Sequence, residues 1–105
     1  MRYGLSPAVI ADFYRVFAQY PEIERVLLFG SRAKNTYKPG SDIDLAVLSA
    51  SLTDTRFTQL WNQIDALPLL FKIDLLHWDR LQQAELKEKI DQEGVVFFDP
   101  LVGQN

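Results

Sequence analysis

Residues 29–45, FGSRAKNTYKPGSDIDL, are the stretch that decides the fold. They begin at the end of a short apolar run, residues 25–29, and a glycine and a serine follow at once. They end in a second apolar run that contains Asp42 and Asp44, where a buried strand would normally carry valine or isoleucine. The stretch therefore predicts two strands joined by a loop, with two carboxylates that packing does not explain.

The composition limits the class of protein. The 105 residues are 48% hydrophobic, which is enough for one compact core, so we expect a single domain over residues 1–105. The net charge of -3 argues against a general nucleic-acid coat protein, although it leaves open an enzyme that acts on nucleotides. There is no cysteine, which excludes disulfides and thiolate zinc sites. No leader pattern or membrane-length apolar run is visible, and we expect a cytoplasmic protein.

Working outward from the central stretch, the periodicity predicts alternating helices and strands. Ser6 and Pro7 begin a helix that Pro21 closes, and Asp79 resembles the start of a capping box for a last helix that Gly94 stops. The other elements are expected as strands over 25–29, 42–48, 71–78 and 95–98 and a helix over 57–67. The fold class is therefore α/β or α+β, a small sheet covered by helices.

The alternation of a strand brings the acidic residues together. Asp42 and Asp44 are two residues apart and share one face, while Ile43, Leu45 and Val47 share the other. Asp74 has the same placement in the third strand and joins them if the two strands pair. Three neighbouring carboxylates repel one another unless cations lie between them, and an all-oxygen ligand set suits Mg²⁺ or Mn²⁺.

The loop between the two strands has the opposite charge. Residues 25–41 carry two arginines besides two lysines and no acid, and Gly30 allows a phosphate to approach the backbone closely. Ser31 adds a hydroxyl at the start of the turn. Taken singly, the acid pair is also typical of a solvated strand end, and Gly30-Ser31 of an ordinary tight turn. Neither an EF-hand loop nor a Walker A motif is present.

Together, GSRA at residues 30–33 and SDIDLAV at residues 41–47 resemble the signature of the DNA polymerase β-like nucleotidyltransferases. The short length resembles the minimal nucleotidyltransferase (MNT) proteins of that superfamily, which implies their small mixed sheet. The resemblance implies that Asp42, Asp44 and Asp74 are catalytic residues that bind two divalent metals, with Asp74 also helping to activate the attacking hydroxyl. It implies that Gly30 and Ser31 hold the nucleotide phosphates.

The role of Arg32 stays open at this point, since it either contacts the phosphates or braces the acidic residues. Asn35 stands where family members often have glycine, and asparagine tolerates the same left-handed backbone.

The same resemblance implies a partner and a reaction. MNT proteins commonly pair with a helical HEPN protein, and in such toxin–antitoxin pairs the MNT member can transfer AMP from ATP to a tyrosine of the toxin. We expect this chain to be such an antitoxin, in a homo- or hetero-oligomer and without membrane contact. Two alternatives remain, a binding module that neutralises its partner by contact alone and a transferase for a small molecule such as an aminoglycoside.

Overall fold

Four strands and three α-helices follow one another along residues 1–102, the part of the chain that this computed structural model describes. In chain order they are α1 (Pro7–Phe17), β1 (Arg25–Phe29), β2 (Ile43–Leu48), α2 (Asp54–Asp65), β3 (Ile73–His77), the short 3-10 helix η1 (Trp78–Arg80), α3 (Ala84–Glu93) and β4 (Val95–Phe98). No helix within these residues is long and apolar enough to cross a membrane.

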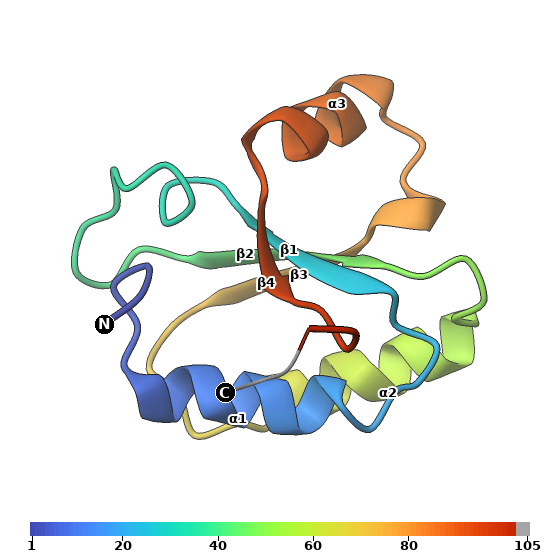
Figure 1. Cartoon of the computed structure of the whole chain (residues 1–105), viewed down its shortest axis with the longest axis horizontal. Helices are drawn as coiled ribbons and strands as arrows, with labels where there is room; N and C mark the ends of the chain where they lie inside the picture. The colour runs from blue at the N-terminus through green and yellow to red at the C-terminus, as the bar shows by residue number, and fades with distance from the viewer. Residues whose placement is uncertain (103–105) are drawn as a thin grey trace.

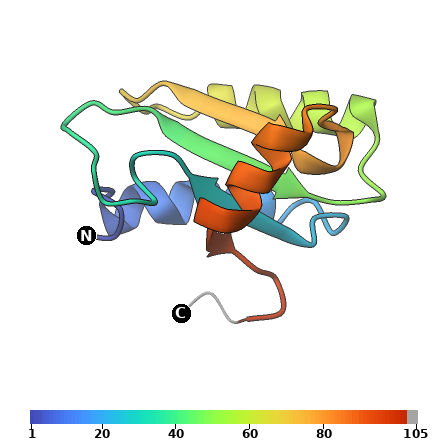
Figure 2. The same cartoon turned by 90° about the horizontal axis from the view of Figure 1, so that it is seen from above.

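The strands form one mixed sheet in the order β3-β2-β1-β4. β1 is antiparallel to both β2 and β4, whereas β2 and β3 run parallel. α1 and α2 cover one face of this sheet and α3 lies on the other, as Figure 1 shows and Figure 2 confirms from above. The predicted small mixed sheet with covering helices is therefore confirmed.

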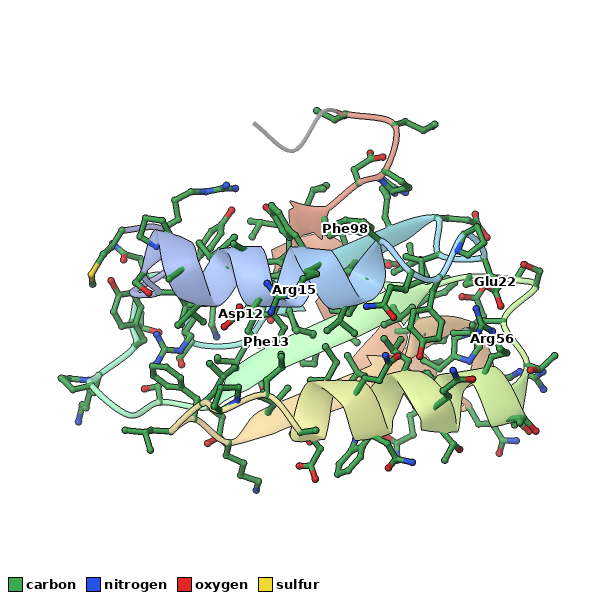
Figure 3. The ribbon with its side chains drawn as sticks, turned by 90° about the horizontal axis from the view of Figure 1, so that it is seen from below. Asp12, Phe13, Arg15, Glu22, Arg56 and Phe98 are labelled. Atoms are coloured by element: carbon green, nitrogen blue, oxygen red, sulfur yellow. The ribbon has the colours of Figure 1, made fainter. Side chains whose placement is uncertain are left out.

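The main core fills the space between the sheet and the two long helices. Ile43, Leu45 and Val47 of β2 belong to this core, as their alternation predicts, together with Phe13 and Phe17 of α1. Phe13 and Phe98 lie along this side of the molecule in Figure 3. A smaller cluster of Leu27, Ala46 and Ile90 joins the opposite face of the sheet to α3.

Local signals explain where the first two long helices begin. The Ser6 hydroxyl accepts a hydrogen bond from the Val9 backbone N–H at 3.3 Å, and Pro7 occupies the first helical turn, as predicted. Thr53 caps α2 in the same way through the N–H of Arg56. α2 begins at Asp54, three residues before the start that the apolar periodicity predicts at Phe57. The periodicity misses this first turn because its residues are polar.

The prediction that Asp79 caps the last helix was wrong. Asp79 lies in the 3-10 helix, and its carboxylate instead accepts a hydrogen bond from the Ser49 backbone N–H at 2.7 Å. α3 begins later, after Gln83, without a side-chain cap. The Asp79 carboxylate thus binds a backbone N–H distant in sequence and not the N–H groups of the following helix. Gly94 does end α3, as predicted, and β4 lies at an edge of the sheet.

Candidate active site

Two of the predicted acidic residues lie side by side on neighbouring strands. The parallel register of β2 and β3 pairs Asp44 with Asp74, and Ile43 with Ile73. Residues paired in this way point to the same face of a sheet. That face is the one covered by α3, since Ala46, two residues after Asp44, packs against Ile90. Asp42 directly precedes β2, so all three acids come from one end of the sheet.

The carboxyl group of Asp44 is affected by its burial and by the two other acids. Burial raises the pKa of Asp44 above its ordinary value, and the negative charges of Asp74 and Asp42 raise it further. Lys72 and Arg32 act in the opposite direction on the same carboxyl group. Both neighbouring acids are therefore close enough to Asp44 for their charges to act on its carboxyl group.

The donor set is suited to a hard divalent cation, although the side chains do not form a complete cage. Within residues 1–102, no group of three or more His, Cys, Asp or Glu side chains is arranged to hold a metal ion. Asp44 and Asp74 pair in backbone register and Asp42 lies two residues before Asp44, and carboxylate oxygens are the ligand type that Mg²⁺ and Mn²⁺ prefer. A cation there would relieve the repulsion that raises the pKa of Asp44.

Gly30 lies directly against the Asp44 carboxylate. It has a φ of +76°, and Phe29, the residue before it, pairs with Asp44 across β1 and β2. A Cβ atom at position 30 would collide with an oxygen of the Asp44 carboxyl group. Glycine is therefore required here for two reasons, the left-handed backbone and the space that the carboxylate occupies. The sequence predicted the glycine's presence at the site but not this contact.

The residues after Gly30 form a compact turn. The Lys34 N–H donates to the Gly30 carbonyl at 3.2 Å, and the Thr36 N–H donates to the Ser31 carbonyl at 3.0 Å. Asn35 has a φ of +61°, so the expectation that it takes the left-handed conformation is confirmed. Ser31 is half-buried at the start of this turn, next to the acidic cluster.

The guanidinium group of Arg32 is directed into the protein. Its side chain is only 2% exposed, and its Nε and Nη2 atoms donate to the Ser41 carbonyl at 3.1 and 2.9 Å. Its Nη1 atom donates to the Tyr3 carbonyl at 2.9 Å. This geometry favours the bracing alternative for Arg32 over a direct contact with phosphates.

Lys72 is a residue of the site that the sequence analysis missed. Its side chain is exposed two residues before Asp74, and its charge favours the ionised form of Asp44. The spacing of two that places Asp42 beside Asp44 also places Lys72 beside Asp74, so the signal was present.

Comparison with known proteins agrees with the geometry. Residues 13–100 match the family model described as polymerase beta, nucleotidyltransferase. The chain belongs to the polymerase β nucleotidyltransferase family. This nucleotidyltransferase domain therefore carries its paired acids and its Gly30-Ser31 turn inside the matched region. No curated protein is significantly similar to the chain.

Solved structures of similar fold include several toxin–antitoxin complexes. One is a toxin–antitoxin with AMP-PNP, matched at 25% identity and a TM-score of 0.68 over 90% of this chain and 74% of that one. Another is the toxin–antitoxin MntA-HepT, at 20% identity and a TM-score of 0.60 over 91% and 74%. A third is a tri-AMPylated Shewanella oneidensis HEPN toxin in complex with MNT antitoxin, at 21% identity and a TM-score of 0.62 over 90% and 72%. The last two establish likeness of fold alone.

Proposed function

We propose that this nucleotidyltransferase transfers AMP from ATP to a hydroxyl group, that of a tyrosine on a HEPN-type partner protein, and thereby acts as an antitoxin. The observation that carries the proposal is the pairing of Asp44 with Asp74 in register, with Gly30 against the Asp44 carboxylate. It is supported by the likeness to a toxin–antitoxin structure that contains an ATP analogue.

Each residue of the site then has a role. Asp42, Asp44 and Asp74 would hold two divalent cations, Mg²⁺ or Mn²⁺, and bound cations would stabilise the charge on the entering and leaving oxygens of the transfer. Gly30 and Ser31 hold the β- and γ-phosphates at the end of β1. Arg32 keeps the loop before Asp42 in place from within the protein.

The reaction is a substitution at phosphorus. The tyrosine oxygen forms a bond with the α-phosphorus of ATP, while the bond from that phosphorus to the bridging oxygen of the β-phosphate breaks. Pyrophosphate leaves, and AMP stays on the tyrosine. Asp74 accepts the hydroxyl proton, a role that suits its exposed position at the edge strand β3.

One of the comparisons supports a HEPN-type protein as the acceptor. One similar structure is a complex in which the HEPN toxin is itself tri-AMPylated. A partner of this type also supplies what the sheet lacks, since α3 packs on Ala46 and Leu27 and leaves the end with the acids half-exposed.

A labelling experiment tests the proposal. The full chain is incubated with α-labelled ATP, Mg²⁺ and a co-purified HEPN-type protein, and label on that protein is measured. We expect transfer by the wild type and a loss of about a hundredfold or more for Asp44→Asn, since even residues outside the ligand shell are often worth 10–100-fold. Asp65→Asn is the matched control, because Asp65 is an exposed acid at the end of α2.

The other outcomes are equally decisive. Label that persists in Asp44→Asn would refute the roles given to the acids. A partner that stays bound without any label would identify an antitoxin that acts by contact alone.

A further inference from the structure

A tight turn near the start of the described chain lies beside the loop of the active site. Arg2 and Leu5 exchange backbone hydrogen bonds of 3.2 and 2.8 Å, and the two residues between them, Tyr3 and Gly4, have φ values of 59° and 73°. This is the geometry of a two-residue hairpin turn with both central residues left-handed. The turn and the loop after β1 lie next to each other in both Figure 1 and Figure 2.

Arg32 connects this turn to the acidic cluster. One edge of its guanidinium group donates to the Tyr3 carbonyl, and the other edge donates twice to the Ser41 carbonyl. The Ser41 carbonyl belongs to the same planar peptide unit as the Asp42 nitrogen. Fixing that oxygen therefore fixes the plane from which the Asp42 side chain starts.

Aromatic rings hold the guanidinium group in place. The Arg32 guanidinium carbon lies 5.2 Å from the centre of the Tyr37 ring and 4.9 Å from that of Phe71. Phe71 lies just before Lys72 and β3, so the contact joins the loop after β1 to the segment that leads to Asp74. Because the side chain is buried, its orientation is set by these partners and not by solvent.

Gly4 allows the turn to approach so closely. A Cβ atom at this position would lie 2.5 Å from Cε2 of Tyr37 and 2.8 Å from Nη1 of Arg32. Both distances are shorter than the contact distance between two non-bonded atoms, so the neighbouring groups would have to move. The turn therefore reaches Arg32 only because residue 4 has no side chain.

We propose that the turn at residues 2–5 is a positioning element of the active site, which sets the orientation of Asp42 through Arg32 and the Ser41 carbonyl. Its effect on AMP transfer rests on the proposed function, whereas the positioning itself is a property of the folded chain. Arg32 is buried and its guanidinium group donates to the Tyr3 and Ser41 carbonyls, so Arg32 and the turn act as positioning groups.

Two substitutions break the connection from opposite ends. Arg32→Lys keeps the charge, but a single ammonium group does not span two carbonyls on opposite edges of the guanidinium. Gly4→Ala leaves Arg32 intact and forces the turn away from it. In the full chain we expect both to shift the backbone amide NMR signals of Asp42 and Asp44. We also expect both to raise the Mn²⁺ concentration at half-saturation about tenfold, because substituting residues just outside the ligand shell typically lowers metal affinity by 10–100-fold.

The chain offers a matched control for each change. Gly40 has a φ of +84°, and nothing lies within 4 Å of the place that a Cβ atom would occupy, so Gly40→Ala adds the same backbone strain next to Ser41 without a collision. Arg15→Lys makes the same chemical change at an exposed arginine of α1 that pairs with Asp12. We expect both controls to leave the Mn²⁺ midpoint as in the wild type, and Arg15→Lys, which is distant in sequence from Asp42, to leave the Asp42 amide signal unchanged as well.

The inference is overturned if Gly4→Ala and Arg32→Lys lower Tm yet leave the Asp42 and Asp44 signals and the Mn²⁺ midpoint equal to those of the controls. Arg32 and the turn would then be structural only. If the two signals move in both variants while the wild type itself binds no Mn²⁺ and transfers no AMP, the positioning is supported and the proposed function fails.

Discussion

The decisive contact at the residue scale is between Gly30 and Asp44. The glycine ends β1 in a left-handed conformation, and the carboxylate occupies the space that a side chain at position 30 would need. The same carboxylate is partly buried and faces two further acids, which together raise its pKa. Asp44 is thus a residue that the fold accommodates at a cost in stability, as is common where function requires a charge.

Asp44→Asn should therefore raise the Tm of the protein at pH 7 by a few degrees in the absence of metal, while AMP transfer is lost. Because the pKa of Asp44 is raised on folding, the folded wild type is stabilised by its proton at low pH, and this stabilisation is lost as the pH rises through the folded pKa. Thermal unfolding at several pH values measures the difference, which should vanish below the ordinary aspartate pKa of 3.8.

Asp65→Asn again serves as the control for this change and should leave Tm nearly unchanged, since Asp65 is exposed. A wild type that is more stable than Asp44→Asn at pH 7 would show instead that the carboxylate is fully compensated by its neighbours.

The main connection between elements away from the site joins the segment after α1 to α2. Arg56 of α2 donates to both carboxylate oxygens of Glu22, at 2.7 and 3.1 Å, and the pair is visible in Figure 3. The guanidinium carbon of Arg56 also lies 4.4 Å from the centre of the Tyr20 ring, and the Tyr20 hydroxyl donates to Gln63. Planar two-point pairing of this kind is the form in which a surface ion pair contributes to stability.

Glu22→Gln should lower Tm at pH 7 by a few degrees without changing AMP transfer at temperatures where the protein is folded. The hydrogen bonds from Arg56 lower the pKa of Glu22, so its stabilisation is present at neutral pH and is lost as the pH falls through the folded pKa. The difference in Tm between wild type and variant should therefore shrink in acid.

Glu85→Gln removes an exposed carboxylate in the first turn of α3 and is the control. A deficit in Tm for Glu22→Gln that does not depend on pH would mean that packing, and not the ion pair, is responsible.

At the scale of the whole molecule, the arrangement of the two helical layers leaves the site open. α1 and α2 cover one face completely enough to bury Ile43, Leu45 and Val47, whereas α3 covers the other face over Leu27 and Ala46. The acids lie on this second face, at the end of the sheet where Asp74 is exposed. Because this end of the sheet is accessible, a substrate can bind there to the folded chain and should raise its stability.

Mg²⁺ and ATP together should raise Tm more than either does alone, because the cation relieves the repulsion among the carboxylates and the phosphates complete its ligand shell. At a hundredfold excess of ligand over Kd, the free energy of unfolding rises by about 2.7 kcal/mol. Differential scanning fluorimetry of the wild type and Asp44→Asn measures the effect, which the variant should lack. An equal response of both proteins would place the binding elsewhere.

The sequence predicted several elements accurately because their signals are local. The strand over residues 25–29 and the strand over 95–98 have the expected bounds, and Ser6, Pro7 and Gly94 act where capping rules place them. The capping role of Asp79 failed because a backbone N–H distant in sequence, that of Ser49, competes for the same carboxylate. Local patterns do not report such competitors.

By itself the sequence determined the alternation that puts Asp42 and Asp44 on the side away from Ile43, Leu45 and Val47, and the motif that marks the family. Only the tertiary structure decided that Asp44 pairs with Asp74, that Gly30 makes room for the Asp44 carboxylate and that Arg32 joins Tyr3 to Ser41. The reason is physical. Periodicity depends on neighbours along the chain, whereas register and buried hydrogen bonds depend on which distant segments the packed core brings into contact.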